Sequence, residues 1–177
     1  MSPEQLKGYI ETVPDFPTPG IRFRDITPLL ASPLAFSETV RLLGERIGAY
    51  MPDAVIAIEA RGFPFAGAIC TQMELPLLPV RKRGKLPRDT VSAAYDLEYG
   101  SDVLELHADV LERYSRLAVV DDLLATGGTA AAVTGMLSDR GAEIACCAFV
   151  VELEGLGGRE SLAPYTVESL VRFSLDE

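Results

Sequence analysis

The chain has 177 residues, of which 48% are hydrophobic and 24% are charged, an ordinary composition for a globular domain with its own core. Its formal net charge of −10 argues against general binding to nucleic acids, which are polyanions. No run of about 18 apolar residues is present, and the N-terminus lacks the basic and apolar parts of a signal peptide. We therefore expect neither a membrane span nor export.

Cysteine and histidine are too scarce to predict a metal cluster. Cys146 and Cys147 are neighbours on an expected strand and point to opposite faces, so packing is a better interpretation than a disulfide or a metal site. An odd number of cysteines, three, fits a reducing cytoplasm. The single histidine, His107, leaves little choice for a Ser-His-Asp triad and is expected on the surface of a strand.

Hydrophobic periodicity and turn residues divide the first half of the chain into short elements. A helix is expected from Ser2 to about residue 9, because serine caps a helix and Pro3 fits its first turn. Three prolines and a glycine make residues 13–20 a stiff loop. The next elements are a strand at 21–26, a helix from Ser32 to about residue 50, a strand at 53–59, a turn at 60–63 leading into a helix to about residue 73, and a strand at 75–80.

The second half begins with a basic loop at residues 81–88 and continues the alternation. The later elements are strands at 90–99 and 101–107 that form an antiparallel excursion, a central strand at 117–122, a helix at 130–140 that stops at Gly141, a strand at 143–151, a short helix at 159–163 and a strand at 166–174. Strands alternating with helices predict an α/β fold, a mostly parallel twisted sheet flanked by helices. No repeat or domain boundary is visible, so residues 1–177 are expected to form one domain.

The most informative stretch is residues 117–129. An apolar, β-branched run at 117–120 predicts a buried strand, and Asp121 and Asp122 stand where it ends. The loop that follows, before a predicted helix, consists of Ala125, Thr126, Gly127, Gly128 and Thr129. Its glycines allow a ligand close to the main chain, and amides at a helix N-terminus favour an anion. Carboxylates that accept from a diol beside a phosphate cradle suit a ribose 5-phosphate.

Blander interpretations of this stretch exist. Asp121 and Asp122 also resemble the end of a Walker B strand, but the partner GxxxxGK[ST] loop is absent, and so is the GxGxxG of a dinucleotide fold. The two acids could instead form a helix N-cap pair. Against these alternatives, charged residues and glycines suited to binding a ligand follow three predicted strands, at 59–62, 81–85 and 121–129. Parallel strands end at the same edge of a sheet, where ligands bind.

A cluster of basic residues stands out on this acidic chain. It consists of Arg81, Lys82, Arg83, Lys85 and Arg88. Charge runs are usually solvated faces, but a cationic loop on an acidic protein can concentrate a polyanionic substrate locally.

Residues 117–129 closely resemble the signature that binds phosphoribosyl pyrophosphate (PRPP) in type I phosphoribosyltransferases. The wider pattern is similar to the adenine phosphoribosyltransferase family, in the same order and at similar spacing. The segments that carry this resemblance are residues 15–21, 23–26, 60–63, 81–87, 97–100 and 121–129. The N-terminal proline-rich stretch and the segment around Glu98 narrow the likeness to the adenine enzymes.

The resemblance implies a type I phosphoribosyltransferase fold with a base-recognition segment at about 1–32 and a small antiparallel lid at about 84–107. It implies transfer of the 5-phosphoribosyl group from PRPP to adenine, giving AMP and pyrophosphate in purine salvage. It also implies a cytoplasmic homodimer that uses Mg²⁺. Because Mg²⁺ is hard and keeps its waters, we expect substrate oxygens to carry it and no dedicated metal site on the chain.

The same resemblance assigns roles to individual residues. Asp121 and Asp122 are expected to hold the ribose hydroxyls, and Arg61 to neutralise pyrophosphate, although Arg61 could be a surface turn residue. Glu98 is expected to handle the purine proton, or to be a solvated hairpin carboxylate. The expected substrate-binding residues are Ala125, Thr126, Gly127, Gly128 and Thr129 for the 5-phosphate, Lys82 and Lys85 for pyrophosphate, Arg22, Phe23, Arg24 and Leu123 for adenine, and Tyr99 at the lid tip. Phe23 could equally be a core residue.

Two rival functions share part of this pattern. Another phosphoribosyltransferase, for a 6-oxopurine, xanthine or pyrimidine, would have the PRPP signature but not the N-terminal segment. A non-catalytic PRPP-sensing regulator would be expected to lose Arg61 or the lid and to carry a basic DNA-binding element. A plain dimerisation module would leave the converging charges unexplained.

Overall fold

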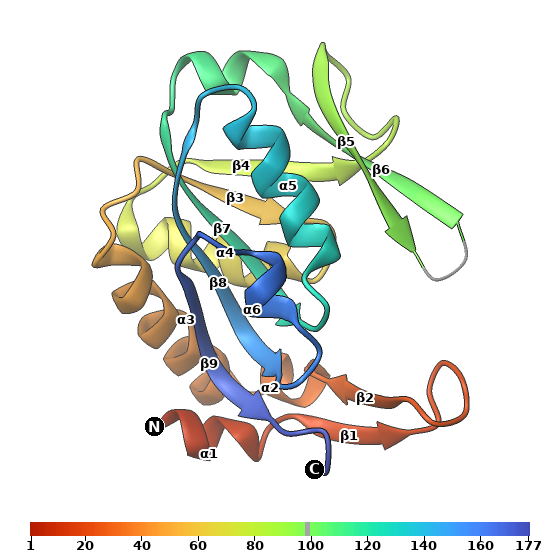
Figure 1. Ribbon diagram of the computed structural model, residues 1–177. Coiled ribbons are helices and arrows are strands. Elements are labelled where there is room, and N and C mark those ends of the chain that lie inside the picture. The colour runs from red at the N-terminus through yellow and green to blue at the C-terminus, as the bar shows by residue number, and fades with distance from the viewer. Residues whose placement is uncertain (98–99) are drawn as a thin grey trace.

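The computed structural model describes residues 1–97 and 100–177, and within them a seven-stranded sheet forms the centre of the molecule (Figure 1). The strands lie in the order β5-β6-β4-β3-β7-β8-β9. The five strands β4, β3, β7, β8 and β9, which are adjacent in this order, run parallel to one another. Strand β6 pairs antiparallel with both β4 and β5. The predicted α/β fold with a mostly parallel sheet and an antiparallel excursion is therefore confirmed.

The elements have the following bounds. The helices are α1 (Pro3–Lys7), α2 (Thr27–Ala31), α3 (Pro33–Gly48), α4 (Gly62–Met73), α5 (Gly128–Ser138) and α6 (Gly158–Ser161), with a 3₁₀ turn at Ala108–Glu112. The strands of the main sheet are β3 (Ala54–Ile58), β4 (Leu77–Lys82), β5 (Thr90–Leu97), β6 (Gly100–His107), β7 (Arg116–Leu124), β8 (Glu143–Leu153) and β9 (Val167–Phe173). A separate antiparallel pair consists of β1 (Glu11–Pro14) and β2 (Arg22–Asp25).

Several expected boundaries were wrong. The stiff loop begins later than expected, because residues 11–14 form β1 by pairing with β2. Helix α2 was missed because five residues between a strand and Ser32 are too few to show a helical period. Arg81 and Lys82 belong to β4 rather than to a loop. Helix α5 ends at Ser138 with Asp139 as its C-cap, so Gly141, at a φ of +83°, is part of the turn beyond.

Helices cover both faces of the sheet because adjacent strand residues point to opposite sides. On one face Val55 and Ala57 pack in a cluster with buried residues of α3 and α4, and on the other Ile56 and Ile58 pack with residues of α5. Cys146 and Cys147 are buried in these two different clusters, which confirms that they face opposite ways. In the part of the chain that the structure describes, no helix is long and apolar enough to span a membrane.

The arrangement leaves one side of the molecule to the loops. The β1–β2 and β5–β6 hairpins project on the same side in Figure 1, with the connection from β7 to α5 between them. The strand pairing puts Ala57 opposite Val120, so the ends of β3 and β7 lie next to each other. Glu59 and Arg61 come just after β3, whereas Asp121 and Asp122 lie near the end of β7, which runs two residues beyond the expected end at 122.

Candidate active site

The connection from β7 to α5, taken together with the first two residues of the helix (residues 125–129), forms one wall of a hollow of about 200 Å³. The hollow is lined by Arg61, Phe149 and residues 121–130. Helix α5 begins at Gly128, and its first amides have no partners within the helix and lie at the positive end of its dipole. Residues 125–129, which we call the phosphate loop, therefore offer donors and positive potential to an anion.

The two glycines of the phosphate loop differ in what they allow. Gly127 has a φ of +81°, which disfavours other residues, and a Cβ there would lie 2.8 Å from the carbonyl oxygen of Gly158. Gly128 is exposed, and a Cβ on it would meet only the Thr126 hydroxyl at 3.9 Å. Gly127 is thus required by the protein itself, whereas Gly128 keeps the approach to the loop open for a ligand.

A pair of acids forms the next wall of the hollow. Asp122 is only 3% exposed, and its Oδ2 lies 2.9 Å from Nε of Arg61. Asp121 is half-buried, and its Oδ1 accepts a hydrogen bond of 2.8 Å from the backbone N–H of Asp122. Burial raises the pKa of Asp121 well above its usual value, and the charge of Asp122 raises it further. Burial also raises the pKa of Asp122, although Arg61 opposes that rise.

Arg61 reaches this acid pair because of a close contact between α4 and β7. Arg61 is the N-cap of α4, and Gly62 is the first residue of the helix. A Cβ on Gly62 would lie 2.9 Å from the carbonyl oxygen of Val120 and 3.0 Å from Oδ1 of Asp121. The side chain of Arg61 is 46% exposed, so its guanidinium is accessible to a ligand while it pairs with Asp122.

A second, apolar hollow of about 510 Å³ shares Arg61 with the first. Its lining consists of Val13, Phe16, Phe23, Asp25, Ile26, Thr27, Leu30, Ala60, Arg61 and Pro64. The ring of Phe16 meets that of Phe23 edge-on, with centroids 5.1 Å apart. The guanidinium carbon of Arg61 lies 5.4 Å from the centroid of the Phe23 ring. Phe23 is therefore a wall of a cavity rather than a core residue.

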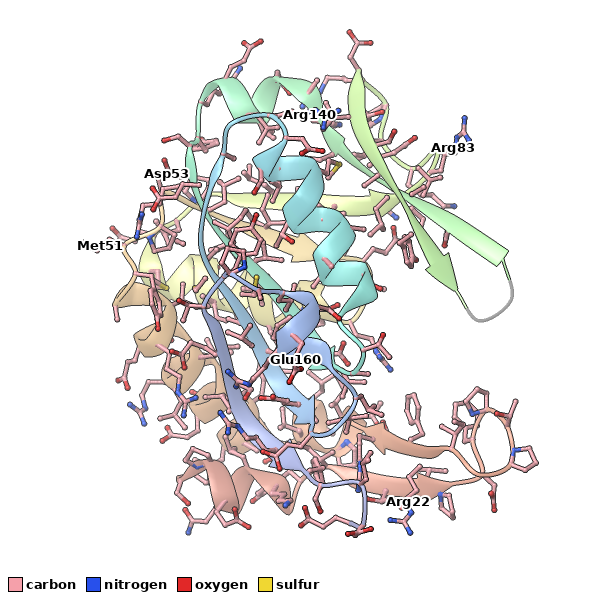
Figure 2. All side chains as sticks on the ribbon, in the orientation of Figure 1. Arg22, Met51, Asp53, Arg83, Arg140 and Glu160 are labelled. Carbon is pink, nitrogen blue, oxygen red and sulfur yellow. The ribbon has the colours of Figure 1, made fainter. Side chains whose placement is uncertain are left out.

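The side chains of the arginines on either side of Phe23 make contacts outside these two hollows. Arg22 lies at the lower edge of the molecule in Figure 2 and donates a hydrogen bond of 3.2 Å to the carbonyl of Leu175. Arg24 is buried, donates to the hydroxyl of Thr12, and places its guanidinium carbon 4.0 Å from the centroid of the Phe173 ring. The side chains of both arginines thus contact other parts of the protein, while Phe23 between them lines the apolar hollow.

Three members of the basic cluster form ion pairs with carboxylates. Arg81 pairs with Glu59 (Nε to Oε2, 3.3 Å), Lys82 with Asp102 (Nζ to Oδ2, 3.0 Å) and Arg88 with Asp109 (Nη1 to Oδ2, 2.7 Å). Glu59 also accepts a hydrogen bond of 2.7 Å from the N–H of Lys82. Arg83 and Lys85 are exposed, and Figure 2 shows Arg83 pointing outward. The charges of Arg81, Lys82 and Arg88 are therefore partly neutralised by carboxylates, which leaves less positive charge to concentrate a polyanion than the sequence alone indicates.

The structure thus brings together Arg61, Asp121, Asp122, Leu123 and the phosphate loop, and places Phe23 beside Arg61. Sequence reasoning missed Phe16, Ile26, Leu30 and Pro64 as cavity-lining residues, because single apolar residues on separate elements give no signal of their own. Glu98 and Tyr99 lie outside the described residues. Among the described residues, no group of three or more His, Cys, Asp or Glu side chains is placed to hold a metal ion.

Residues 25–171 match the model of the phosphoribosyl transferase domain family. The adenine phosphoribosyltransferase of Synechococcus sp. (strain CC9902) is 51% identical to the chain over 174 residues, which cover 98% of this chain and 99% of that protein. The chain belongs to the adenine phosphoribosyltransferase family.

Solved structures of adenine phosphoribosyltransferases agree with this membership. The enzyme from Thermoanaerobacter pseudethanolicus matches with a TM-score of 0.92 and 42% identity, over 97% of this chain and 100% of that one. The Saccharomyces cerevisiae enzyme, whose crystals contain an imino-altritol bisphosphate and adenine, matches with a TM-score of 0.88 and 33% identity, over 95% of this chain and 97% of that one. The family is one of transferases, and its fold is the one described above.

Proposed function

We propose that the chain transfers the 5-phosphoribosyl group of PRPP to adenine, giving AMP and pyrophosphate in purine salvage. One observation carries this proposal beyond family membership: a phosphate loop, a buried acid pair and an arginine line one hollow, and that arginine also lines an apolar hollow walled by Phe23. The arrangement fits a substrate with a phosphate at one end, a diol in the middle and a flat base next to it.

The phosphate loop would bind the 5-phosphate. Its backbone amides and the positive end of α5 attract the anion, and the hydroxyls of Thr126 and Thr129 add further donors. Because the amide donors belong to the backbone of a loop packed against α6, they are held in place before the ligand arrives, and little ordering free energy is lost on binding.

The acid pair would bind the ribose hydroxyls and stabilise the transition state. Displacement at the anomeric carbon passes through an oxocarbenium-like state, in which positive charge grows on the sugar. Negative charge at Asp121 and Asp122 is favourable to that cation, and the effect is large because Asp122 is buried away from water. Ribose hydroxyls that donate to the carboxylates would also offset the burial that raises the pKa of both acids.

Arg61 would bind the leaving pyrophosphate. Its guanidinium pairs with Asp122 and lies 5.4 Å from the centroid of the Phe23 ring, so PRPP has to compete for it. A forked guanidinium suits a diphosphate, while the exposed Lys85 adds a compact positive charge, and Lys82 does so if it leaves Asp102. Mg²⁺ prefers oxygen ligands, and the carboxylates of Asp121 and Asp122 fit that preference. It would be bound mainly by substrate oxygens and would neutralise the diphosphate.

Adenine would stack on Phe23, with Leu123 covering the opposite side. The side chains of Arg22 and Arg24 contact Leu175, Thr12 and Phe173, so we propose that the base edge is read by their main-chain groups. Glu98 as the group that handles the purine proton, and Tyr99 at the lid tip, remain predictions from the family resemblance. The same is true of the cytoplasmic homodimer.

The proposal is tested by pyrophosphate release with PRPP and Mg²⁺, measured separately with adenine, hypoxanthine and guanine. We expect adenine to be the preferred base and Asp122→Asn to lower turnover by at least ~100-fold with the fold intact, the usual scale for one electrostatic group. Faster release with hypoxanthine or guanine would favour the rival enzyme for another base. A folded protein that binds PRPP but releases no pyrophosphate with any base would favour a PRPP-sensing regulator.

A further inference from the structure

Helix α6 packs against the phosphate loop through backbone atoms. A Cβ on Gly158, the first residue of α6, would collide with the carbonyl oxygen of Ala125 and lie 2.8 Å from Cγ of Leu124. A Cβ on Gly127 would in turn lie 2.8 Å from the carbonyl oxygen of Gly158. Neither side of this contact has room for an additional methyl group, so a displacement of α6 has to be followed by the loop.

The position of α6 is fixed by the side chain of its second residue, Arg159. Its Nε donates to Oε1 of Glu152 at 2.6 Å and its Nη2 to Oε2 at 2.7 Å, while its Nη1 donates to the carbonyl of Val167 at 2.8 Å. Glu152 lies on β8 and also accepts from the hydroxyl of Ser169 on β9. One guanidinium therefore ties α6 to two strands of the main sheet.

The ion pair between Arg159 and Glu152 holds α6 strongly, although the helix has only four residues. Glu152 is 7% exposed, and burial alone would raise its pKa, but the hydrogen bonds from Arg159 and Ser169 lower the pKa below its usual value. A forked, charge-assisted pair is among the strongest polar contacts in proteins, and its loss would leave the buried Glu152 with only the Ser169 hydroxyl and a longer pair to Nε of Arg172 at 3.4 Å. A helix of four residues cannot hold its position through its own hydrogen bonds.

We propose that Arg159 is a positioning residue for the 5-phosphate: held by Glu152, it presses α6 against the phosphate loop and fixes the loop's amides. Arg159 lines a separate hollow of about 200 Å³ beside α6 and is not among the residues lining the phosphate hollow. It acts on the ligand only through Gly158 and the loop. The inference rests on the proposed function, because it takes the loop to be the 5-phosphate site.

The positioning role predicts a selective defect. The contacts of Gly158 are with Leu124, Ala125 and Gly127, all at the phosphate end, whereas Phe23 at the base end belongs to β2. Weakening the Arg159–Glu152 pair should therefore reduce the affinity for the phosphate and leave the affinity for adenine nearly unchanged. A general loss of folding stability would affect both.

The test uses two variants and a matched control. Arg159→Lys keeps the charge but loses the fork, and Gly158→Ala inserts a methyl group at the contact with the loop. Gly135→Ala in α5 is the control, because a Cβ there meets nothing within 4 Å. The measurements are the KM for PRPP, the KM for adenine, the Kd for ribose 5-phosphate by calorimetry, and amide hydrogen exchange in residues 124–131.

We expect both variants to raise the KM for PRPP and the Kd for ribose 5-phosphate by at least ~10-fold, the scale of a displaced supporting group. The KM for adenine should stay within about 2-fold of the wild-type value, hydrogen exchange in the loop should be faster, and the control should match the wild type. If Gly158→Ala does not fold, Arg159→Lys decides the matter.

Unchanged phosphate affinity in folded Arg159→Lys would overturn the positioning role, and so would equal losses for both substrates. A wild-type protein that does not bind ribose 5-phosphate would instead contradict the proposed function. In that case hydrogen exchange still tests whether Arg159 holds the phosphate loop in place. Unchanged exchange in the loop of Arg159→Lys would overturn this positioning role.

Discussion

At the scale of single residues, the acid pair shows a conflict between stability and chemistry. Two adjacent carboxylates stand near the end of a strand whose preceding residues, Leu117 to Val120, are fully buried. Burial and mutual repulsion raise the pKa of Asp121, which means that its charged form is disfavoured in the folded protein. Sites that hold charges for a reaction commonly lower the stability of the fold that carries them.

We therefore expect Asp121→Asn to be more stable than the wild type at pH 7, by about 1 kcal/mol, the scale of a single-site change. Asparagine can still accept the hydrogen bond from the N–H of Asp122 but carries no charge. The pKa of Asp121 is raised in the folded state, so its folded carboxyl binds a proton more tightly than its unfolded one. Its contribution to stability is then favourable at low pH and is lost as pH rises from about 3.8 through the folded pKa.

Urea denaturation of both proteins from pH 7 down to pH 4 checks this expectation. The advantage of Asp121→Asn should shrink towards pH 4, where the wild-type carboxyl takes up its proton. A variant less stable than the wild type at pH 7, or an advantage that grows as pH falls, would show that the carboxylate is not strained by burial.

Individual residues also show what a sequence can and cannot reveal about a site. The phosphate loop and the acid pair before it were predictable because the acids, threonines and glycines all lie within residues 121–129. The ion pairs of Arg81, Lys82 and Arg88 were not, because their partners Glu59, Asp102 and Asp109 lie about 20 residues away along the chain. Charge runs are visible in a sequence, whereas their neutralisation depends on tertiary contacts.

At the scale of elements, the contact between the N-terminus of α4 and the end of β7 positions Arg61. Gly62 makes this contact possible, because its missing Cβ leaves room for the backbone of Val120 and for Oδ1 of Asp121. The same element contains a second glycine, Gly67, where a Cβ meets nothing within 4 Å. The helix thus provides its own control for a substitution at the contact.

We expect Gly62→Ala to lower the free energy of unfolding by about 1–3 kcal/mol, the usual effect of overpacking. Gly67→Ala should instead raise it, by up to about 1 kcal/mol, because alanine favours a helix over glycine. Gly62→Ala should also weaken activity, since either α4 or the acid pair has to move. Urea denaturation of the two variants measures the difference, and equal stabilities would mean that the α4–β7 contact tolerates a methyl group.

The elements that were predictable are those with a clear period or an uninterrupted apolar run. Helix α3 shows a clear period, since Val40, Leu43 and Ile47 are all buried, and β3 is an uninterrupted apolar run. Strand β1 was missed because it is short, ends in a proline and exists only through its pairing with β2. Helix α2 was missed because it contains little more than one turn.

At the scale of the whole molecule, strand order determines the site. Strands β3 and β7 are neighbours in the sheet although about 60 residues separate them, and their pairing brings Arg61 to Asp122. Alternating strands and helices predicted that the charged strand ends would meet at one edge. The order β5-β6-β4-β3-β7-β8-β9 was not predictable, because periodicity indicates what an element is and not which neighbour it pairs with.

Seen whole, the molecule offers a backbone loop for a sugar phosphate and two acids for its diol. The most direct test is a crystal structure of the protein with AMP. We predict that the phosphoryl group lies against the amides of residues 125–129, that the ribose hydroxyls face Asp121 and Asp122, and that adenine stacks on Phe23. A phosphoryl group bound elsewhere would contradict the account.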